Sequence, residues 1–167
     1  MHWLMFILIM AVYASINFRE LFPKGSDPRE ALKALHFMLG LSVILLLFIR
    51  IWARFSSPKP PITPHLNKLQ TFLSNFLHYF LYAMMIVMPI LGWLTLSASG
   101  KVIPFFGIEL PALIAKNKTY AESLKEIHQT IGKIGYYVIT LHVGAALFHH
   151  YIKRDNTLSR MLPEFKR

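Results

Sequence analysis

Four long apolar stretches constrain this chain more than any other feature of its sequence. They cover roughly residues 2–20, 34–55, 72–98 and 127–152. A bilayer core ~30 Å thick needs about 20 apolar residues in helical form, so each stretch is able to cross a membrane. With 54% hydrophobic residues and a mean hydropathy of +0.44, the chain is too apolar for an ordinary soluble domain. We predict an all-α integral membrane four-helix bundle, with residues 1–167 forming a single transmembrane domain.

The charge distribution points to a lipid environment. The formal net charge is +10, and the basic residues lie mostly between and after the apolar stretches. This placement favours anionic lipid headgroups, rather than nucleic acid, as the partner of the basic residues. The first apolar stretch lacks a basic segment before it and is too long for the core of a signal peptide, so we predict a retained span.

The fourth stretch carries two histidines, His128 and His142, fourteen residues apart. At ~100° per residue they lie within about 40° of one helix face and ~21 Å apart along the axis. Gly132 and Gly135 lie on the same side and leave room for a flat, bulky group against the backbone. Because ionisable groups are costly inside a bilayer, they tend to mark function there. Two imidazoles at two depths therefore indicate two haems, although hydrogen-bonded core histidines are the alternative.

Other spans offer a partner imidazole at each depth. With four spans, His36 opens its span from the same side of the membrane as His128, and Gly40 leaves clearance one turn later. His2 opens the first span from the opposite side, at the level of His142. A haem iron in a helical bundle takes axial ligands from two helices. The depths yield two such pairs, His36 with His128 and His2 with His142.

Two further points bear on the haem sites. The chain has no cysteine, which excludes covalent c-type attachment, so the expected cofactors are two non-covalent haem b groups. His78, six residues into the third span, is an alternative partner for His142. Its other interpretation is a buried imidazole that is hydrogen-bonded to a neighbouring helix.

Three residues near the inner haem are additional candidates. Arg50, fourteen residues after His36, lies on the same helix face, where it would bind a haem propionate or a lipid phosphate. His149, seven residues after His142, is placed to pass protons to a quinone or to lie at headgroup level. Trp3 is a candidate wall of the inner haem or the quinone, with the interfacial aromatic belt as the alternative.

Short segments along the whole chain follow one family pattern in order. They are His2-Trp3-Leu4, Phe18-Arg19-Glu20-Leu21-Phe22-Pro23, His36 with Gly40, Pro89-Ile90-Leu91-Gly92, His128 with His142, and the run 145–163. In these segments the sequence resembles the bacterial cytochrome b561 family of four-helix dihaem membrane cytochromes. Members of that family usually carry more residues before the first histidine than the single Met1 found here, so we expect a late or truncated start.

The resemblance implies a location, a topology and a ligand set. It implies a bacterial inner-membrane protein with both termini in the cytoplasm. The Lys and Arg counts of the two sides, nine and eight, give little orientation by themselves. The family pattern has one axial histidine on each of the first two spans and two on the fourth, which implies the ligands His2, His36, His128 and His142.

Within the family, the sequence is most similar to the superoxide oxidases. The resemblance implies that an electron passes from superoxide at the periplasmic face through both haems, and that ubiquinone is reduced near the cytoplasmic face. The expected partners are lipid, a quinone, and superoxide or another periplasmic electron donor. One alternative is an electron-transfer subunit between quinol and a periplasmic partner protein, without substrate chemistry of its own. A second is a non-redox membrane protein such as a transporter.

Overall fold

Long helices make up most of the chain in the computed structural model, which describes residues 1–56, 63 and 67–161. Within these residues, four helices are long and apolar enough to cross a membrane. Helices suit this environment because their own hydrogen bonds satisfy the backbone polar groups. The predicted class of an all-α bundle with four membrane-spanning helices is confirmed. The helices are α1 (His2–Phe18), α2 (Asp27–Ser56), α3 (Lys68–Ala98) and α4 (Lys118–Tyr151).

The helices α3 and α4 begin before the apolar stretches that open near residues 72 and 127. Asn67 and Gln70 form a reciprocal capping box at the start of α3, with hydrogen bonds of 2.8 and 3.1 Å. The side chain of Asn117 caps α4 in a similar way by accepting a backbone N–H. Because polar caps rather than apolar residues decide where a helix begins, both helices include polar first turns.

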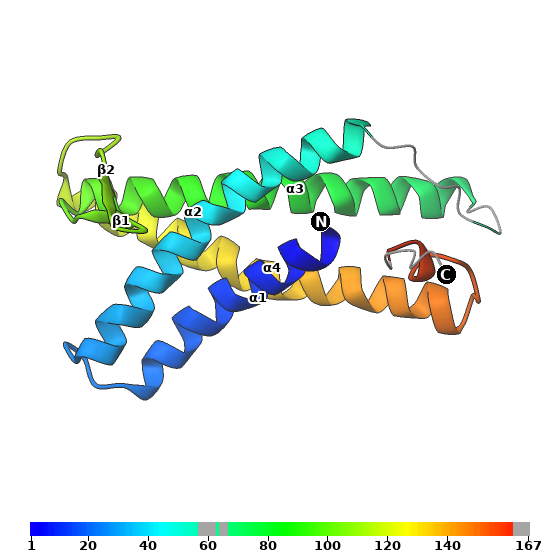
Figure 1. The fold of residues 1–167 in the computed structure, drawn as a ribbon, viewed down its shortest axis with the longest axis horizontal. Helices are drawn as coiled ribbons and strands as arrows, with labels where there is room; N and C mark the ends of the chain where they lie inside the picture. Colours follow the sequence, from blue (N-terminus) through cyan, green and yellow to red (C-terminus); the bar gives the residue numbers. More distant parts are fainter. Residues whose placement is uncertain (57–62, 64–66, 162–167) are drawn as a thin grey trace.

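The four helices form two pairs, α1 with α2 and α3 with α4, and α2 also crosses α3 (Figure 1). A cluster of buried apolar side chains holds α1 against α2, formed by Met5, Val43 and Leu47. A second cluster joins Leu41 of α2 to Leu96 of α3. Many other large apolar side chains are exposed, as expected where lipid is the solvent.

A two-stranded antiparallel hairpin, which we did not predict, lies in the loop between α3 and α4. It pairs β1 (Ile103–Phe105) with β2 (Ile108–Leu110). Phe106 and Gly107 between the strands have φ values of 46° and 89°, as the favoured two-residue hairpin turn requires. The side chain of Ile103 is buried against α2 and α3, so the hairpin is packed on the bundle.

The two ends of the bundle carry different structures. The hairpin and the α1–α2 turn, which includes η1 (Arg19–Leu21), lie at one end, here named the hairpin end (Figure 1). The C-terminal segment, which includes η2 (Ser159–Met161), lies at the opposite end, here named the tail end.

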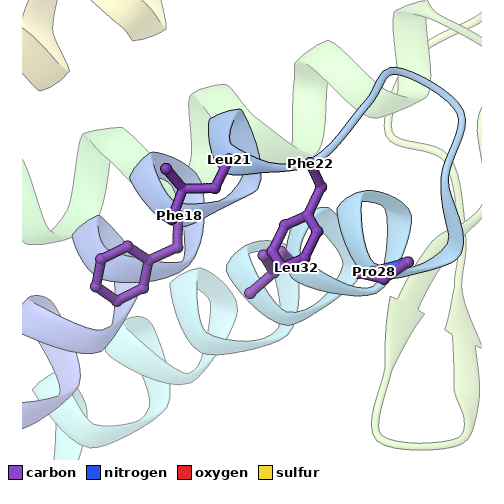
Figure 2. Close-up of a pocket in the computed structure, with 5 residues that line it drawn as sticks. All are labelled: Phe18, Leu21, Phe22, Pro28 and Leu32. Carbon is purple, nitrogen blue, oxygen red and sulfur yellow. The ribbon is translucent and has the colours of Figure 1, made fainter.

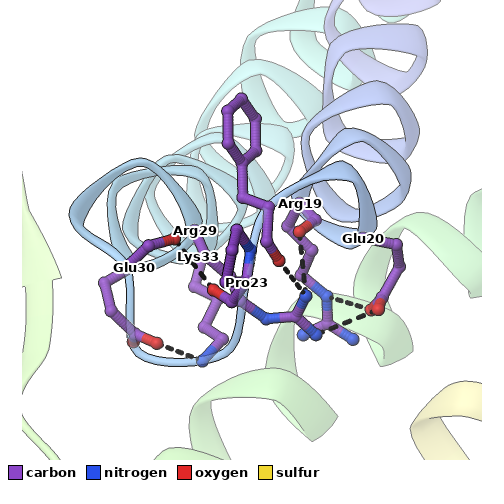
Figure 3. A network of polar contacts seen from close by, with 8 residues as sticks. Arg19, Glu20, Pro23, Arg29, Glu30 and Lys33 are labelled. Atoms are coloured by element: carbon purple, nitrogen blue, oxygen red, sulfur yellow. Dashed lines mark hydrogen bonds and ion pairs between the residues drawn. The ribbon is translucent and has the colours of Figure 1, made fainter.

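A buried arginine braces the α1–α2 turn at the hairpin end. The guanidinium of Arg29 donates hydrogen bonds to the carbonyl oxygens of Arg19 and Phe22, at 3.0 and 2.8 Å. It also pairs with the carboxylate of Glu20 at 2.9 Å (Figure 3). The buried charge therefore has a partner on each side, which is the condition for a buried charge to stabilise a turn.

An apolar groove of about 430 Å³ lies beside this turn (Figure 2). None of its lining residues is a histidine, so it is separate from the candidate haem ligands. The lining residues are Phe18, Leu21, Phe22, Pro28 and Leu32.

Candidate functional site

The first histidine pair lies towards the hairpin end, between α2 and α4. The ring centroids of His36 and His128 are 6.3 Å apart, and the ring planes are inclined by 82°. Nδ1 of His36 lies 3.0 Å from the carbonyl oxygen of Val12, which is a suitable acceptor for its proton. Gly92 of α3 lies behind His128, where a Cβ atom would be 3.5 Å from the imidazole. Both rings are therefore held from behind by a different helix.

The second pair lies towards the tail end, between α1 and α4. The ring centroids of His2 and His142 are 6.1 Å apart, with the planes inclined by 37°. Nδ1 of His2 is buried and has no hydrogen-bond partner among the residues that the structure describes. Nδ1 of His128 and Nδ1 of His150 are also buried without a partner among these residues, so this feature does not distinguish the His2/His142 pair.

The spacing of both pairs fits one iron held between two imidazoles. A metal lies ~2.0 Å from the imidazole nitrogen that binds it, and the ring centre lies about 1 Å farther. Two rings on opposite sides of one haem iron therefore have centroids ~6 Å apart. The observed 6.3 and 6.1 Å match this value, so the residues present fit two bis-histidine haems.

His78 of α3 also approaches the second pair. Its ring centroid is 5.3 Å from that of His142, with the rings edge to face at 85°. Nδ1 of His78 lies 2.6 Å from the carbonyl oxygen of Ser74 in its own helix. The structure therefore brings His2 and His78 to the same imidazole, and the His2 spacing is the closer to that of a shared iron.

The glycines of α4 do not leave the space that the sequence indicated. The hydroxyl of Tyr13 donates a hydrogen bond of 2.9 Å to the carbonyl oxygen of Gly132. A Cβ atom at Gly135 would overlap the same hydroxyl. The expectation of clearance for a flat cofactor was wrong at Gly135, because a tyrosine from α1 fills the space, whereas at Gly132 a Cβ atom would make an ordinary 3.5 Å contact with Met88. At Gly40, in contrast, a Cβ atom would have no neighbour within 4 Å among the described residues, so that clearance exists.

Arg50 lies at the level of the second pair. Its charge is close enough to act on both His2 and His142. Nε of Arg50 donates a hydrogen bond of 3.3 Å to the hydroxyl of Tyr82, and its guanidinium lies 5.8 Å from that ring. Tyr82 is a partner that the sequence did not indicate.

The C-terminal segment connects both predicted quinone residues at the tail end. Nδ1 of His149 lies 2.6 Å from a carboxylate oxygen of Asp155. The indole nitrogen of Trp3 donates a hydrogen bond of 3.0 Å to the carbonyl oxygen of Met161. Sequence reasoning missed Asp155. The available signal was Thr157 two residues later, whose N–H the carboxylate accepts in a local turn.

Comparisons with known proteins bear on the class to which this chain belongs. A family model described as prokaryotic cytochrome b561 matches residues 1–164. The chain is 35% identical to "Cytochrome b561 homolog 1" of Escherichia coli (strain K12), over 99% of this chain and 94% of that protein. It is 34% identical to "Probable superoxide oxidase CybB" of Yersinia pestis, over 98% of this chain and 92% of that protein.

A third relative and the family match settle the class of protein. "Cytochrome b561 homolog 2" of Escherichia coli (strain K12) is 28% identical over 96% of this chain and 86% of that protein. These relationships imply b-type haem and membrane electron transfer, and they exclude the transporter alternative. Together with the four spans, the prokaryotic family indicates a bacterial inner-membrane protein. The chain belongs to the prokaryotic cytochrome b561 family.

Proposed function

We propose that this protein binds two b-type haems and oxidises superoxide at one membrane face while reducing ubiquinone at the other. The observation that carries the proposal is that His128 and His142 of α4 each lie opposite an imidazole of another helix, with ring centroids 6.3 and 6.1 Å apart. His36 and His128 hold the first haem, and His2 and His142 hold the second. Bound haem iron supplies the one-electron chemistry, and the protein supplies spacing, access and protons.

The hairpin end faces the periplasm in this proposal, and both termini face the cytoplasm. Superoxide then meets the His36/His128 site, and ubiquinone meets the tail end near His149 and Trp3. Superoxide as the donor is supported by the 34% identity to a probable superoxide oxidase from Yersinia pestis. The tail end supports quinone chemistry because it holds an imidazole and an indole, one able to move protons and the other able to pack against a ring.

Arg50 serves the second haem as the partner of a propionate. Arg50 follows His36 by fourteen residues on α2, which places it on the same helix face. A guanidinium binds a carboxylate in a fixed geometry, and the Tyr82 hydroxyl beside it limits how far the guanidinium can swing away.

The experiment uses the purified full-length protein in detergent, with an enzymatic source of superoxide and a soluble ubiquinone. We expect superoxide to reduce the haems, as seen in the Soret and α bands, and quinol to form only when the protein is present. If the haems are reduced without superoxide, or if no quinol forms, superoxide is not the electron donor.

The second candidate is an electron-transfer subunit between quinol and a periplasmic partner protein. It is favoured by the charge of the periplasmic loops, where eight Lys and Arg residues face six acids and leave little net field to attract an anion. Haems that quinol reduces, but that superoxide leaves oxidised, would support this candidate.

A further inference from the structure

His149 and Asp155 form a buried pair at the tail end. Nδ1 of His149 and one carboxylate oxygen of Asp155 are 2.6 Å apart, and the Asp155 side chain is only 2% exposed. The other carboxylate oxygen accepts the N–H of Thr157 at 2.9 Å. The N–H of Asp155 donates to the carbonyl oxygen of His149 at 3.1 Å. Both carboxylate oxygens are thus engaged, and the carboxylate is fixed relative to the imidazole.

This geometry decides which nitrogen of His149 is able to exchange a proton. A neutral imidazole has one N–H and one lone pair, and a carboxylate accepts only the N–H. Asp155 therefore keeps the proton on Nδ1 and leaves Nε2 as the atom that gains or gives a second proton. Burial by itself raises the pKa of Asp155, but hydrogen bonds from Thr157 and His149 outweigh it, and the net pKa lies below the usual range. The carboxylate is therefore ionised at neutral pH.

The pair lies beside the region where the second haem is proposed. His149 follows His142 by seven residues on α4, ~10 Å along the axis and nearly on the same face. The C-terminal segment that supplies Asp155 also contacts Trp3, the neighbour of His2, through Met161. One short segment therefore contacts α4 at His149 and α1 at Trp3, which is next to His2.

The structure describes two contacts of this imidazole and one lysine near them. Asp155 is the charged group that contacts it from the C-terminal segment. Lys153 lies over the ring of the neighbouring Phe148, 6.0 Å from its centroid. The ring of Phe148 meets His149 edge to face at 5.9 Å and covers one side of it with carbon rather than charge.

We propose that Asp155 is a positioning residue for quinone protonation, holding His149 so that Nε2 delivers a proton to the quinone oxygen. This inference rests on the proposed reduction of ubiquinone. Two superoxide ions give two electrons and become two O₂ molecules, and the quinone gains these electrons and two protons to become quinol. For one of the two protons, the Nε2–H bond of His149 breaks and an O–H bond forms on the quinone, and the second proton comes to the other quinone oxygen from water. The neutral imidazole then takes a proton from cytoplasmic water, while Asp155 stays ionised throughout.

The direction in which Asp155→Asn should change the pH profile follows from the negative charge of the Asp155 carboxylate. The Asp155 carboxylate favours the protonated, positively charged form of the His149 imidazole, and its removal disfavours that form. An opposite charge in contact with a titratable group favours the charged form of that group. In Asp155→Asn, the alkaline limb of the pH profile for quinone reduction should move down by about one pH unit, with an about tenfold lower rate at alkaline pH.

The test measures the oxidation of pre-reduced haem by ubiquinone in a stopped-flow instrument across a pH series, after removal of excess dithionite. Asp155→Asn should show the shifted limb, with both haems retained and an unchanged rate of haem reduction by superoxide. Asp155→Glu should restore part of the alkaline rate. Ser159→Ala is the matched control, because it removes a 3.0 Å hydrogen bond of the same segment without touching the pair. It should keep the wild-type pH profile.

A second measurement does not depend on turnover. In ¹⁵N-histidine spectra of the reduced, diamagnetic protein, the His149 resonance, assigned by its loss in His149→Gln, should titrate at lower pH in Asp155→Asn. An unshifted titration would overturn the inference, as would a rate that falls equally at every pH.

The outcomes also separate this inference from the proposed function. If superoxide fails to reduce the haems but the pre-reduced wild type passes electrons to quinone with the Asp155-dependent profile, the proposed donor is wrong and the inference stands. If wild type and Asp155→Asn share one profile, the inference is wrong and the proposed function stands. If pre-reduced wild type does not reduce quinone, both are overturned.

Discussion

Tyr13 of α1 donates a 2.9 Å hydrogen bond to the carbonyl oxygen of Gly132 on α4, 119 residues later in the chain. Its ring also lies 4.4 Å from the ring of Tyr136, whose hydroxyl accepts a 2.7 Å hydrogen bond from Asn17. On α4 these contacts fall between His128 and His142. Two tyrosines therefore join α1 to α4 in the interval between the two proposed haem sites.

The Tyr13 contact makes position 135 sensitive to size. Gly135→Ala should destabilise the protein by about 1–3 kcal/mol, because the added methyl group overlaps the Tyr13 hydroxyl and a methyl group of Met84. Gly144→Ala, on the same helix with open space around its Cβ, should be neutral or slightly stabilising. Thermal unfolding of the two variants in one detergent checks the difference. Equal melting temperatures would contradict this account of Gly135.

Loss of the Tyr13 hydrogen bond should destabilise the protein less than Gly135→Ala does. Tyr13→Phe keeps the ring and removes the hydroxyl, and it should cost about 0.5–1.5 kcal/mol. Both haems should remain bound, because Tyr13 is not a proposed ligand. Haem content and the melting temperature, measured on one preparation, check both parts of this prediction.

The histidine pairs predict how haem is lost. Wild-type protein should hold two haems per chain in a pyridine haemochrome assay, and His128→Ala and His142→Ala should each hold one. The two losses should be independent, since the two positions lie ~21 Å apart along α4. Electron entry should fail in His128→Ala, whereas in His142→Ala the remaining haem should be reduced once without quinol formation. A single variant that loses both haems while folded would argue against separate sites.

The assignment of the second pair depends on two competing histidines. His2→Ala should copy His142→Ala, and His36→Ala should copy His128→Ala. His78→Ala should retain both haems, because its 5.3 Å spacing from His142 is shorter than two imidazoles on one iron require. Loss of one haem in His78→Ala, with both haems kept in His2→Ala, would transfer the ligand role to α3.

His149 should be dispensable for haem binding but not for quinone reduction. His149→Ala should keep two haems and the superoxide-driven haem reduction, while quinol formation slows by about 10²-fold because a general acid is lost. His150→Ala, at the adjacent position, is the control and should retain the wild-type rate. The haemochrome assay and the quinol assay are run on the same samples. Loss of a haem in His149→Ala would show that this histidine is a ligand.

The four spans and the expected depths of the histidines follow from the order of residues along the chain. Apolar length is a local property, and a bilayer allows little besides helices for such segments. The fourteen-residue interval on α4 likewise follows from helix geometry alone. The expected depths of His36 and His2 then follow because successive spans cross the membrane in opposite directions.

The depth of a residue does not specify which side chains contact it, and these contacts depend on how the helices and loops pack together. Whether Gly135 faces a cofactor or the Tyr13 hydroxyl depends on how α1 is rotated and tilted against α4. The carboxylate of Asp155 reaches His149 because the chain reverses after α4, with Arg154 at a φ of 55°. The hairpin over α2 and α3 depends on the burial of Ile103 by residues of both helices. Each of these features is a contact between segments distant in sequence or a turn in irregular chain, and neither is encoded in the periodicity of a single span.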